Sequence, residues 1–177
     1  MKTGDLKQTK KITMVALFSG TAVILSTFRI IIPGICKISF DGPFYKFISI
    51  VWGPSYGFIS AFLVETIGAL LNPVGHYTPL FSLTAGLRGF LVGFIWKFLN
   101  KLFYFKSKIL KLIITVFISD MLICFLNSLI IKFYLCQTKK TFLCIIITRF
   151  IKESILIVIN IVILVIMLKD NNKTVKS

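Results

Sequence analysis

The sequence predicts an all-α integral membrane protein, a six-transmembrane-helix bundle that forms one domain. Of its 177 residues, 56% are hydrophobic, and the mean hydropathy is +0.92. Several apolar segments reach the length of about 20 helical residues that crosses the hydrocarbon core of a bilayer. They exceed the roughly 9 to 11 residues of a barrel strand and lack its alternating pattern. A helix satisfies its backbone hydrogen bonds internally, so helices are expected for these segments in lipid.

Six apolar segments follow one another along the chain and are predicted to be helices. They cover residues 12–32, 44–52, 54–71, 80–98, 109–133 and 141–168. Gly53-Pro54 lies between the second and the third segment, where it either separates two helices or kinks a single one. The segments alone therefore allow five or six crossings.

The distribution of lysines favours six crossings with both termini in the cytoplasm. Twelve lysines then lie on the inner side and five on the outer side, as the positive-inside rule requires. The five outer residues are Lys37, Lys46, Lys132, Lys139 and Lys140. The membrane domain is predicted to comprise residues 12–168, with cytoplasmic tails at residues 1–11 and 169–177.

The formal net charge of +15 follows from these lysines, which fix the topology and contact anionic headgroups of the lipid bilayer. Nucleic acid is therefore not an expected partner. Cys36, Cys124, Cys136 and Cys144 have no C-x-x-C spacing, and the chain has one histidine. Neither a metal site nor a cofactor is predicted. Cys136 and Cys144 either form a disulfide across an outer loop or remain buried thiols.

Small residues recur at helical spacing in the first half of the chain. Examples are Ala16-x-x-x-Gly20 in the first segment and Gly53-x-x-x-Gly57 in the third. Helices in lipid associate through close contact at such residues. The motifs indicate either packing within the chain or, for Ala16 and Gly20, a surface on which a partner docks.

Ionisable residues inside the predicted spans need an explanation, because each costs on the order of 2.5 to 3.5 kcal/mol to insert. Arg88 lies deep in the fourth segment and either pairs with Glu65 or binds an anionic group of a ligand, as a planar guanidinium does well. Arg29 lies near the outer end of the first segment, where it either extends to the interface or points into a pocket. The remaining residues of this kind are Asp120, Arg149 and Glu153.

Helical spacing predicts which of the later charges face each other. Asp120 and Asn127 are seven residues apart, so they share one face of the fifth segment. Arg149 and Glu153, four residues apart in the sixth segment, are expected to pair, whereas the neighbours Lys152 and Glu153 are not expected to face each other.

An uncharged loop with two prolines, residues 72–80, joins the third and fourth segments. His76 in this loop is expected to make hydrogen bonds and not to act as a catalytic base, because no nucleophile stands at a recognisable spacing from it. Four aromatic residues either stack on a flat ligand or belong to an interfacial aromatic belt, and they are Trp52, Tyr56, Tyr77 and Phe81.

Six short motifs occur in order along the chain. They are residues 11–20, Ile38-Ser-Phe40, Trp52-Gly53-Pro54-x-x-Gly57, Glu65-Thr-Ile-Gly68, Asn72-Pro73-x-Gly75 and Leu87-Arg88-Gly89-x-x-x-Gly93. Together the motifs resemble the substrate-binding S components of energy-coupling factor (ECF) vitamin transporters, and most of all the folate-specific subfamily. The resemblance runs from Lys11 to about Leu168, and Asn127 and Arg149 fall where that subfamily also tends to carry Asn and Arg.

The resemblance implies a vitamin-binding subunit in the plasma membrane of a bacterium. Such a subunit associates with a transmembrane coupling protein and two cytoplasmic ATPases, and it topples in the membrane to release its vitamin inside. The chain itself is not expected to be an enzyme, and it has no G-x-x-x-x-G-K-[ST] motif. The docking face of the family maps onto Ala16 and Gly20.

The resemblance and the residue chemistry together suggest a set of substrate-binding residues. They are Arg29, Trp52, Glu65, His76, Tyr77, Phe81, Arg88, Asn127 and Arg149. Folate would need aromatic or apolar walls for its rings and cations such as Arg29 and Arg88 for its glutamate tail. The alternatives are an S component for another vitamin such as pantothenate or thiamine, a small membrane enzyme, and a scaffold without a ligand.

Overall fold

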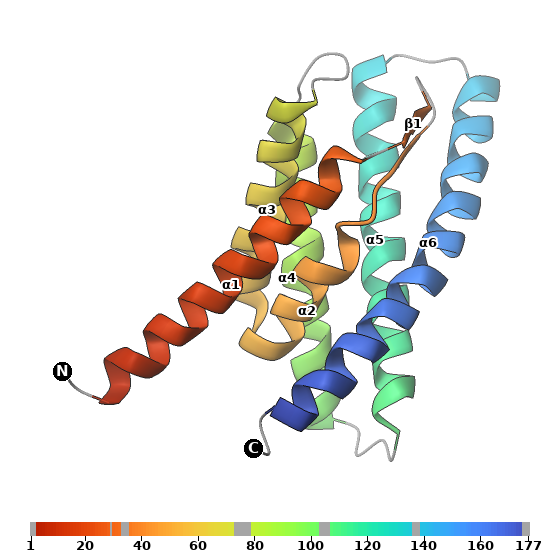
Figure 1. The fold of residues 1–177 in the computed structure, drawn as a ribbon. Coiled ribbons are helices and arrows are strands. Elements are labelled where there is room, and N and C mark those ends of the chain that lie inside the picture. The colour runs from red at the N-terminus through yellow and green to blue at the C-terminus, as the bar shows by residue number, and fades with distance from the viewer. Residues whose placement is uncertain are drawn as a thin grey trace.

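The computed structural model describes residues 3–28, 30–32, 36–72, 79–102, 107–135 and 139–174. They form six helices and one small sheet (Figure 1). The elements are α1 (Thr3–Thr27), β1 (Ile30–Ile32), β2 (Cys36–Ile38), α2 (Gly42–Trp52), α3 (Pro54–Leu71), α4 (Pro79–Leu102), α5 (Lys108–Leu135) and α6 (Lys139–Thr174). The predicted all-α bundle is confirmed. α1 and α6 extend into the segments predicted as tails.

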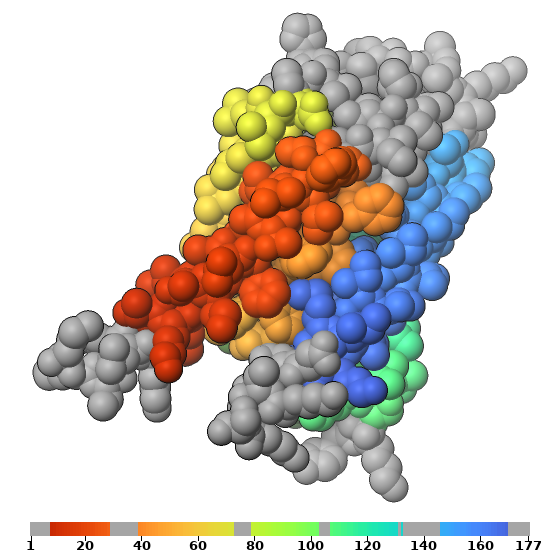
Figure 2. All heavy atoms as spheres, in the orientation of Figure 1, coloured from red at the N-terminus to blue at the C-terminus, as the bar shows by residue number. Residues whose placement is uncertain are grey.

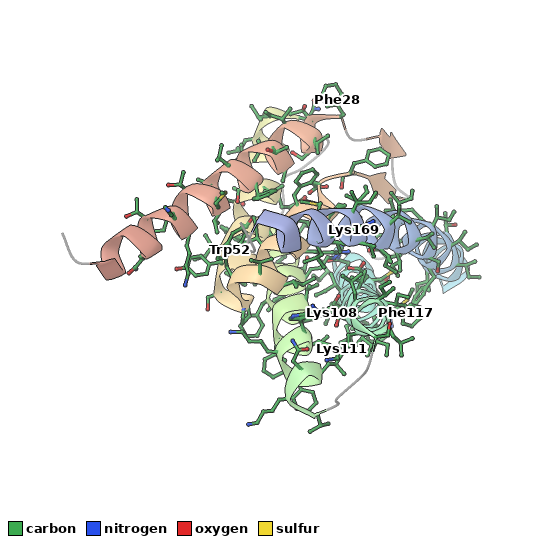
Figure 3. The ribbon with its side chains drawn as sticks, turned by 60° about the horizontal axis from the view of Figure 1, so that its bottom comes forward. Phe28, Trp52, Lys108, Lys111, Phe117 and Lys169 are labelled. Carbon is green, nitrogen blue, oxygen red and sulfur yellow. The ribbon has the colours of Figure 1, made fainter. Side chains whose placement is uncertain are left out.

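Successive helices, with the short α2 included, run in opposite directions, so the bundle has two distinct ends (Figure 1). The sheet end carries β1 and β2, the beginnings of α4 and α6, and the ends of α3 and α5. The terminal end carries the beginning of α1, the junction of α2 with α3, and the end of α6. The side chains of Lys108, Lys111 and Lys169 lie at the terminal end (Figure 3).

The predicted first helix is too long at its C-terminal side. α1 ends at Thr27, and residues 30–32 form β1, which pairs antiparallel with β2 through Ile30 and Ile38, Ile31 and Lys37, and Ile32 and Cys36. Three successive β-branched residues favour a strand. Pro33 also disfavours the helical conformation of the residue before it. Local sequence therefore overrides the apolar character that suggested a longer span.

Gly53 separates α2 from α3, which settles the question of a kink or a break. Its φ of 106° and ψ of 174° lie in a region that glycine adopts without the steric cost of a side chain. Pro54 begins α3 at a position where its missing N–H is harmless. α2 has 11 residues, which span about 17 Å and cannot cross a hydrocarbon core of about 30 Å.

Four helices among the described residues are long and apolar enough to cross a membrane, and they are α3, α4, α5 and α6. α1 and α2 complete the bundle, and Figure 2 shows α2 lying between α1 and α6 on one face. Phe47 of α2 packs in the buried core with Leu112 and Val116 of α5 and with Ile157 and Leu164 of α6.

α3 and α4 pack so closely that their backbones touch. A Cβ atom on Gly57 would lie 2.8 Å from the carbonyl oxygen of Gly89, and a Cβ atom on Gly89 would meet the carbonyl oxygen of Gly57. The Ser49 hydroxyl of α2 donates a hydrogen bond to the Gly89 carbonyl oxygen. For these glycines, the expected packing within the chain is therefore confirmed.

Candidate functional site

A group of charged side chains lies inside the bundle, where four helices meet. It consists of Lys46 from α2, Arg88 from α4, Asp120 from α5, and Lys152 and Glu153 from α6, and we call these five residues the buried ion network. Lys46 Nζ lies 2.5 Å from Asp120 Oδ2. Arg88 Nη2 lies 3.1 Å from Glu153 Oε1, and Lys152 Nζ lies 2.8 Å from Glu153 Oε2. The network thus connects elements that are far apart in the sequence.

The side chains of the buried ion network differ in the fraction of their surface that is exposed. The side chains of Lys46, Asp120 and Glu153 are 0%, 1% and 4% exposed. Those of Arg88 and Lys152 are 21% and 19% exposed. Arg88 and Lys152 are therefore the two members that a ligand can reach.

The network also has an uneven balance of charge and of hydrogen bonds. Three cations face two carboxylates, so the formal excess is one positive charge when all five groups are ionised. Arg88 Nε and Asp120 Oδ1 lie 3.8 Å apart. Both atoms are buried and have no hydrogen-bond partner among the residues that the structure describes. A charge buried without full compensation is costly, and such sites in membrane proteins are functional by default.

Of the two alternatives for Arg88, the ion pair with Glu65 is wrong. Arg88 forms its ion pairs with Asp120 and Glu153. The face of α4 that meets α3 is formed by Gly89 and Gly93. Arg88 points away from that face, toward α5 and α6, while Glu65 is half-buried on α3.

Two further expectations about charge are also wrong. Lys152 does reach the carboxylate of the adjacent Glu153, with its Nζ 2.8 Å from Glu153 Oε2. Lys46 is not an outer-side lysine but a fully buried member of the network. α2 begins inside the bundle, after β1 and β2, which places its second turn among the other helices. Glu153 forms ion pairs with Arg88 and Lys152, and its expected pair with Arg149 stays a prediction.

Three predicted site residues lie between the network and the sheet end, as their positions along the helices show. Asn127 Oδ1 accepts a hydrogen bond of 2.7 Å from the Thr84 hydroxyl, which joins α5 to α4. Thr84 is one helical turn from Arg88. Phe81 precedes Thr84 on α4, and Arg149 lies one turn before Glu153 on α6; both side chains are half-buried.

The other predicted site residues are placed differently or not described. Trp52 lies at the terminal end (Figure 3), where its ring centroid is 6.2 Å from that of Phe18 and 5.9 Å from that of Phe47. Arg29, His76 and Tyr77 lie outside the described residues. At the sheet end, Asn72 Nδ2 donates a hydrogen bond of 2.9 Å to the Thr27 carbonyl oxygen, which ties the end of α3 to the end of α1.

Sequence reasoning missed Lys46, Asp120, Lys152 and Glu153 as members of one site. Asp120 and Glu153 carried a signal, since each is an acidic residue within a predicted span. Lys46 carried a weaker one, a lysine between two aromatic residues of an apolar segment. Among the described residues, no group of three or more His, Cys, Asp or Glu side chains could hold a metal ion.

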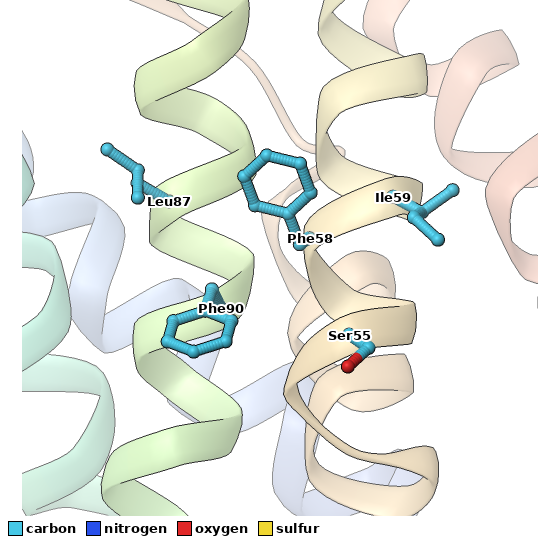
Figure 4. Close-up of a pocket in the computed structure, with 5 residues that line it drawn as sticks. All are labelled: Ser55, Phe58, Ile59, Leu87 and Phe90. Carbon is cyan, nitrogen blue, oxygen red and sulfur yellow. The ribbon is translucent and has the colours of Figure 1, made fainter.

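A shallow apolar groove runs along the outside of the bundle between α3 and α4 (Figure 4). Its volume is about 440 Å³, and its lining is formed by Ser55, Phe58, Ile59, Leu87 and Phe90. Ile59 and Phe90 are exposed, and the lining has no charged residue. The groove is thus separate in chemistry from the buried ion network.

Residues 6–173 match the sequence profile of a family described as ECF-type riboflavin transporter, S component. A solved structure of the S component of a bacterial ECF transporter superposes with a TM-score of 0.72 at 17% identity, over 96% of this chain and 99% of that one. The crystal structure of FolT bound with folic acid superposes with a TM-score of 0.70 at 24% identity, over 87% of this chain and 91% of that one. No curated protein matches the chain.

The two solved structures show that the bundle has the S-component fold. The four long apolar helices make it a multi-pass membrane protein. The profile match extends over nearly the whole chain, and the chain accordingly belongs to the ECF-type riboflavin transporter S component family.

Proposed function

We propose that this chain is the vitamin-binding subunit of an ECF-type importer and that its vitamin is folate. The observation that carries the choice of vitamin is the buried ion network with its single excess positive charge. Folate carries carboxylates on its glutamate tail, and one of them would neutralise that excess at the partly exposed Arg88 and Lys152. Binding of a carboxylate by arginine is favoured where water is excluded.

Other vitamins fit the network less well. Riboflavin, which gives the matching family its description, is uncharged at neutral pH and has no group to neutralise the excess. Thiamine is a cation and would add to it. Pantothenate has a carboxylate but no flat ring, and it is the second candidate. The structural similarity to FolT supports folate as well, although it bears directly only on the fold.

The proposed site extends from the buried ion network to the sheet end. Arg88 would bind a carboxylate, and Phe81 would contact a ring of the vitamin. The amide of Asn127, held by Thr84, and the guanidinium of Arg149 would donate hydrogen bonds. We propose Arg29, Glu65, His76 and Tyr77 as further contacts on the sequence argument. The aromatic contacts of Trp52 support a packing role for that residue.

The proposed importer also contains a transmembrane coupling protein and two cytoplasmic ATPases, which would release the vitamin into the cytoplasm as this subunit topples. Ala16 and Gly20 on α1 would form the docking face. Both residues are exposed, and a Cβ atom on Gly20 would meet nothing within 4 Å in the described part of the chain. A small, open helix surface of this kind favours close approach of another helix.

The proposal is tested by purifying the chain in detergent and identifying any small molecule that leaves it on denaturation. Mass spectrometry and ultraviolet absorbance identify the compound, and fluorescence titration with folic acid gives its affinity. Riboflavin, pantothenate and thiamine are titrated in parallel. Copurified folate or tight binding of folic acid supports the proposal. Tight binding of one of the other three alone replaces the vitamin, and no binding of any of them contradicts the proposed function.

A further inference from the structure

Asp120 divides its two carboxylate oxygens between two cations, and it does so unequally. Its Oδ2 lies 2.5 Å from Lys46 Nζ. Its Oδ1 lies 3.8 Å from Arg88 Nε, which is beyond the 2.7 to 3.2 Å of a normal N–H···O hydrogen bond. Neither Oδ1 nor Nε has another hydrogen-bond partner in the part of the chain that the structure describes. Asp120 therefore does not form a close ion pair with Arg88.

Arginine and a carboxylate ordinarily form a close, often bidentate pair. The structure contains one reason why Asp120 does not form it, which is the competing contact with Lys46. Without Lys46, Asp120 would be a buried carboxylate with no close cation, and Arg88 would be the nearest group able to neutralise it. Because an unpaired buried charge is costly, Asp120 would then draw the guanidinium toward α5.

Lys46 also supplies the excess charge of the network. Without it, Arg88 and Lys152 would be matched by Asp120 and Glu153, and the formal charge of the remaining four groups would be zero. Lys46 has no exposed surface, so a ligand that meets Arg88 and Lys152 does not have to touch it. Its influence on a ligand would act through Asp120 and through the net charge.

We propose that Lys46 and Asp120 are positioning residues that keep Arg88 available, and the site positively charged, for an anionic group of the substrate. This inference rests on the proposed function. Lys46 holds Asp120, and the guanidinium of Arg88 is held on its other side by Glu153. The substrate class that follows is a vitamin with a carboxylate or a comparable anionic group.

If Lys46 and Asp120 act as positioning residues, the affinity for folic acid should depend on the formal charge of the network. A purely structural role of the two residues would not lead to this dependence. The formal charge of the network is +1 in the native protein and becomes 0 in Lys46→Met, +2 in Asp120→Asn and +1 again in the double variant. We expect the affinity for folic acid to follow this order of charge. Lys46→Met weakens binding by about 10- to 100-fold, as expected for one charge removed at short range in a partly buried site. The double variant returns to within about 3-fold of the native affinity, and Asp120→Asn binds no more weakly than the native protein.

Folic acid affinity of the four proteins is measured by fluorescence titration at one fixed pH. The matched control is Lys111→Met, which removes a lysine that binds Asn100 Oδ1 at the terminal end, outside the network. It is expected to bind folic acid as the native protein does. Native-like binding by Lys46→Met would overturn the proposal. So would weak binding by a double variant whose melting temperature shows that it is folded.

A second measurement needs no ligand and so separates this inference from the proposed function. In the ligand-free protein, the Arg88 Nε–H signal is observed by ¹⁵N NMR and assigned by its loss in Arg88→Lys. Lys46→Met is expected to shift this signal and slow its exchange with water, because Nε–H now donates to Asp120. The double variant restores the native signal. An unchanged signal in Lys46→Met would overturn the positioning role, even if the native protein binds folic acid; a shifted signal supports that role even if the vitamin is a different one.

Discussion

The two sides of α4 differ in how they meet their neighbours. Toward α3, Gly89 and Gly93 bring backbone against backbone, and no atom larger than hydrogen fits at these positions. Toward α5 and α6, Arg88 pairs with the carboxylates of Asp120 and Glu153, and its Nε has no hydrogen bond among the described residues. The first side is suited to hold the bundle together, and the second is suited to bind a ligand. Substitutions on the two sides should therefore affect different properties.

The largest expected effect is on the glycine side. Gly89→Val would place a side chain where the carbonyl oxygen of Gly57 already lies. The backbone of α3 or α4 has to move, because the Gly57 carbonyl oxygen belongs to the backbone and not to a flexible side chain. We therefore expect the free energy of unfolding to fall by about 3 kcal/mol or more. Thermal unfolding in detergent measures this change. Gly20→Val is the matched control, because a Cβ atom there meets nothing within 4 Å in the described part of the chain; equal melting temperatures of the two variants would contradict the close packing of α3 and α4.

The next effect is on the charged side and concerns binding. We expect Arg88→Ala to weaken folic acid binding by about 100-fold, as for loss of one partner of a charge-assisted contact worth about 2 to 3 kcal/mol. The fold should survive, because Asp120 keeps Lys46 and Glu153 keeps Lys152. Assembly with the coupling protein should also be unchanged. Fluorescence titration and copurification with the coupling protein measure the two properties, with Lys108→Ala at the terminal end as a control. Unchanged affinity would remove Arg88 from the site.

A smaller effect is expected at the hydrogen bond between the uncharged side chains of Thr84 on α4 and Asn127 on α5. Thr84→Val removes the donor that holds Asn127 Oδ1 at 2.7 Å and keeps the shape of the side chain. We expect about 1 kcal/mol of binding free energy to be lost, which corresponds to about a 5-fold weaker affinity. Thr66→Val is the control, since the Thr66 hydroxyl donates a hydrogen bond to the Phe62 carbonyl oxygen of its own helix, α3. An equal loss in both variants would show that the Thr84 contact does not orient Asn127 for the vitamin.

The sequence predicted the helices well, but it did not predict which side chains of different helices pair with each other. Hydropathy and the Gly53-Pro54 break gave the six helices, and the exception was Ile30–Ile32, where β-branching and Pro33 decided for a strand. Helical periodicity tells which residues share a face but not which neighbour that face meets. Arg88 was therefore recognised as a functional candidate, whereas its partners on α5 and α6 were not. Lys46 was misplaced for the same reason, because only the tertiary arrangement shows that its side chain is buried between α2 and the other helices.

The smallest effect on the chain itself is expected on α1, away from both sides of α4. Gly20→Trp adds a large side chain at an exposed position with open space around it, so the melting temperature and the affinity for folic acid should stay close to native values. Transport should nevertheless stop, because a bulky residue prevents the close helix contact that docking needs. Uptake of radiolabelled folic acid into proteoliposomes with the complete importer measures this. Met14→Trp is the control, because Met14 is exposed and lies about 120° around the helix axis from Gly20. Normal uptake by Gly20→Trp would mean that docking uses another surface, and binding and coupling would then not be divided between α4 and α1.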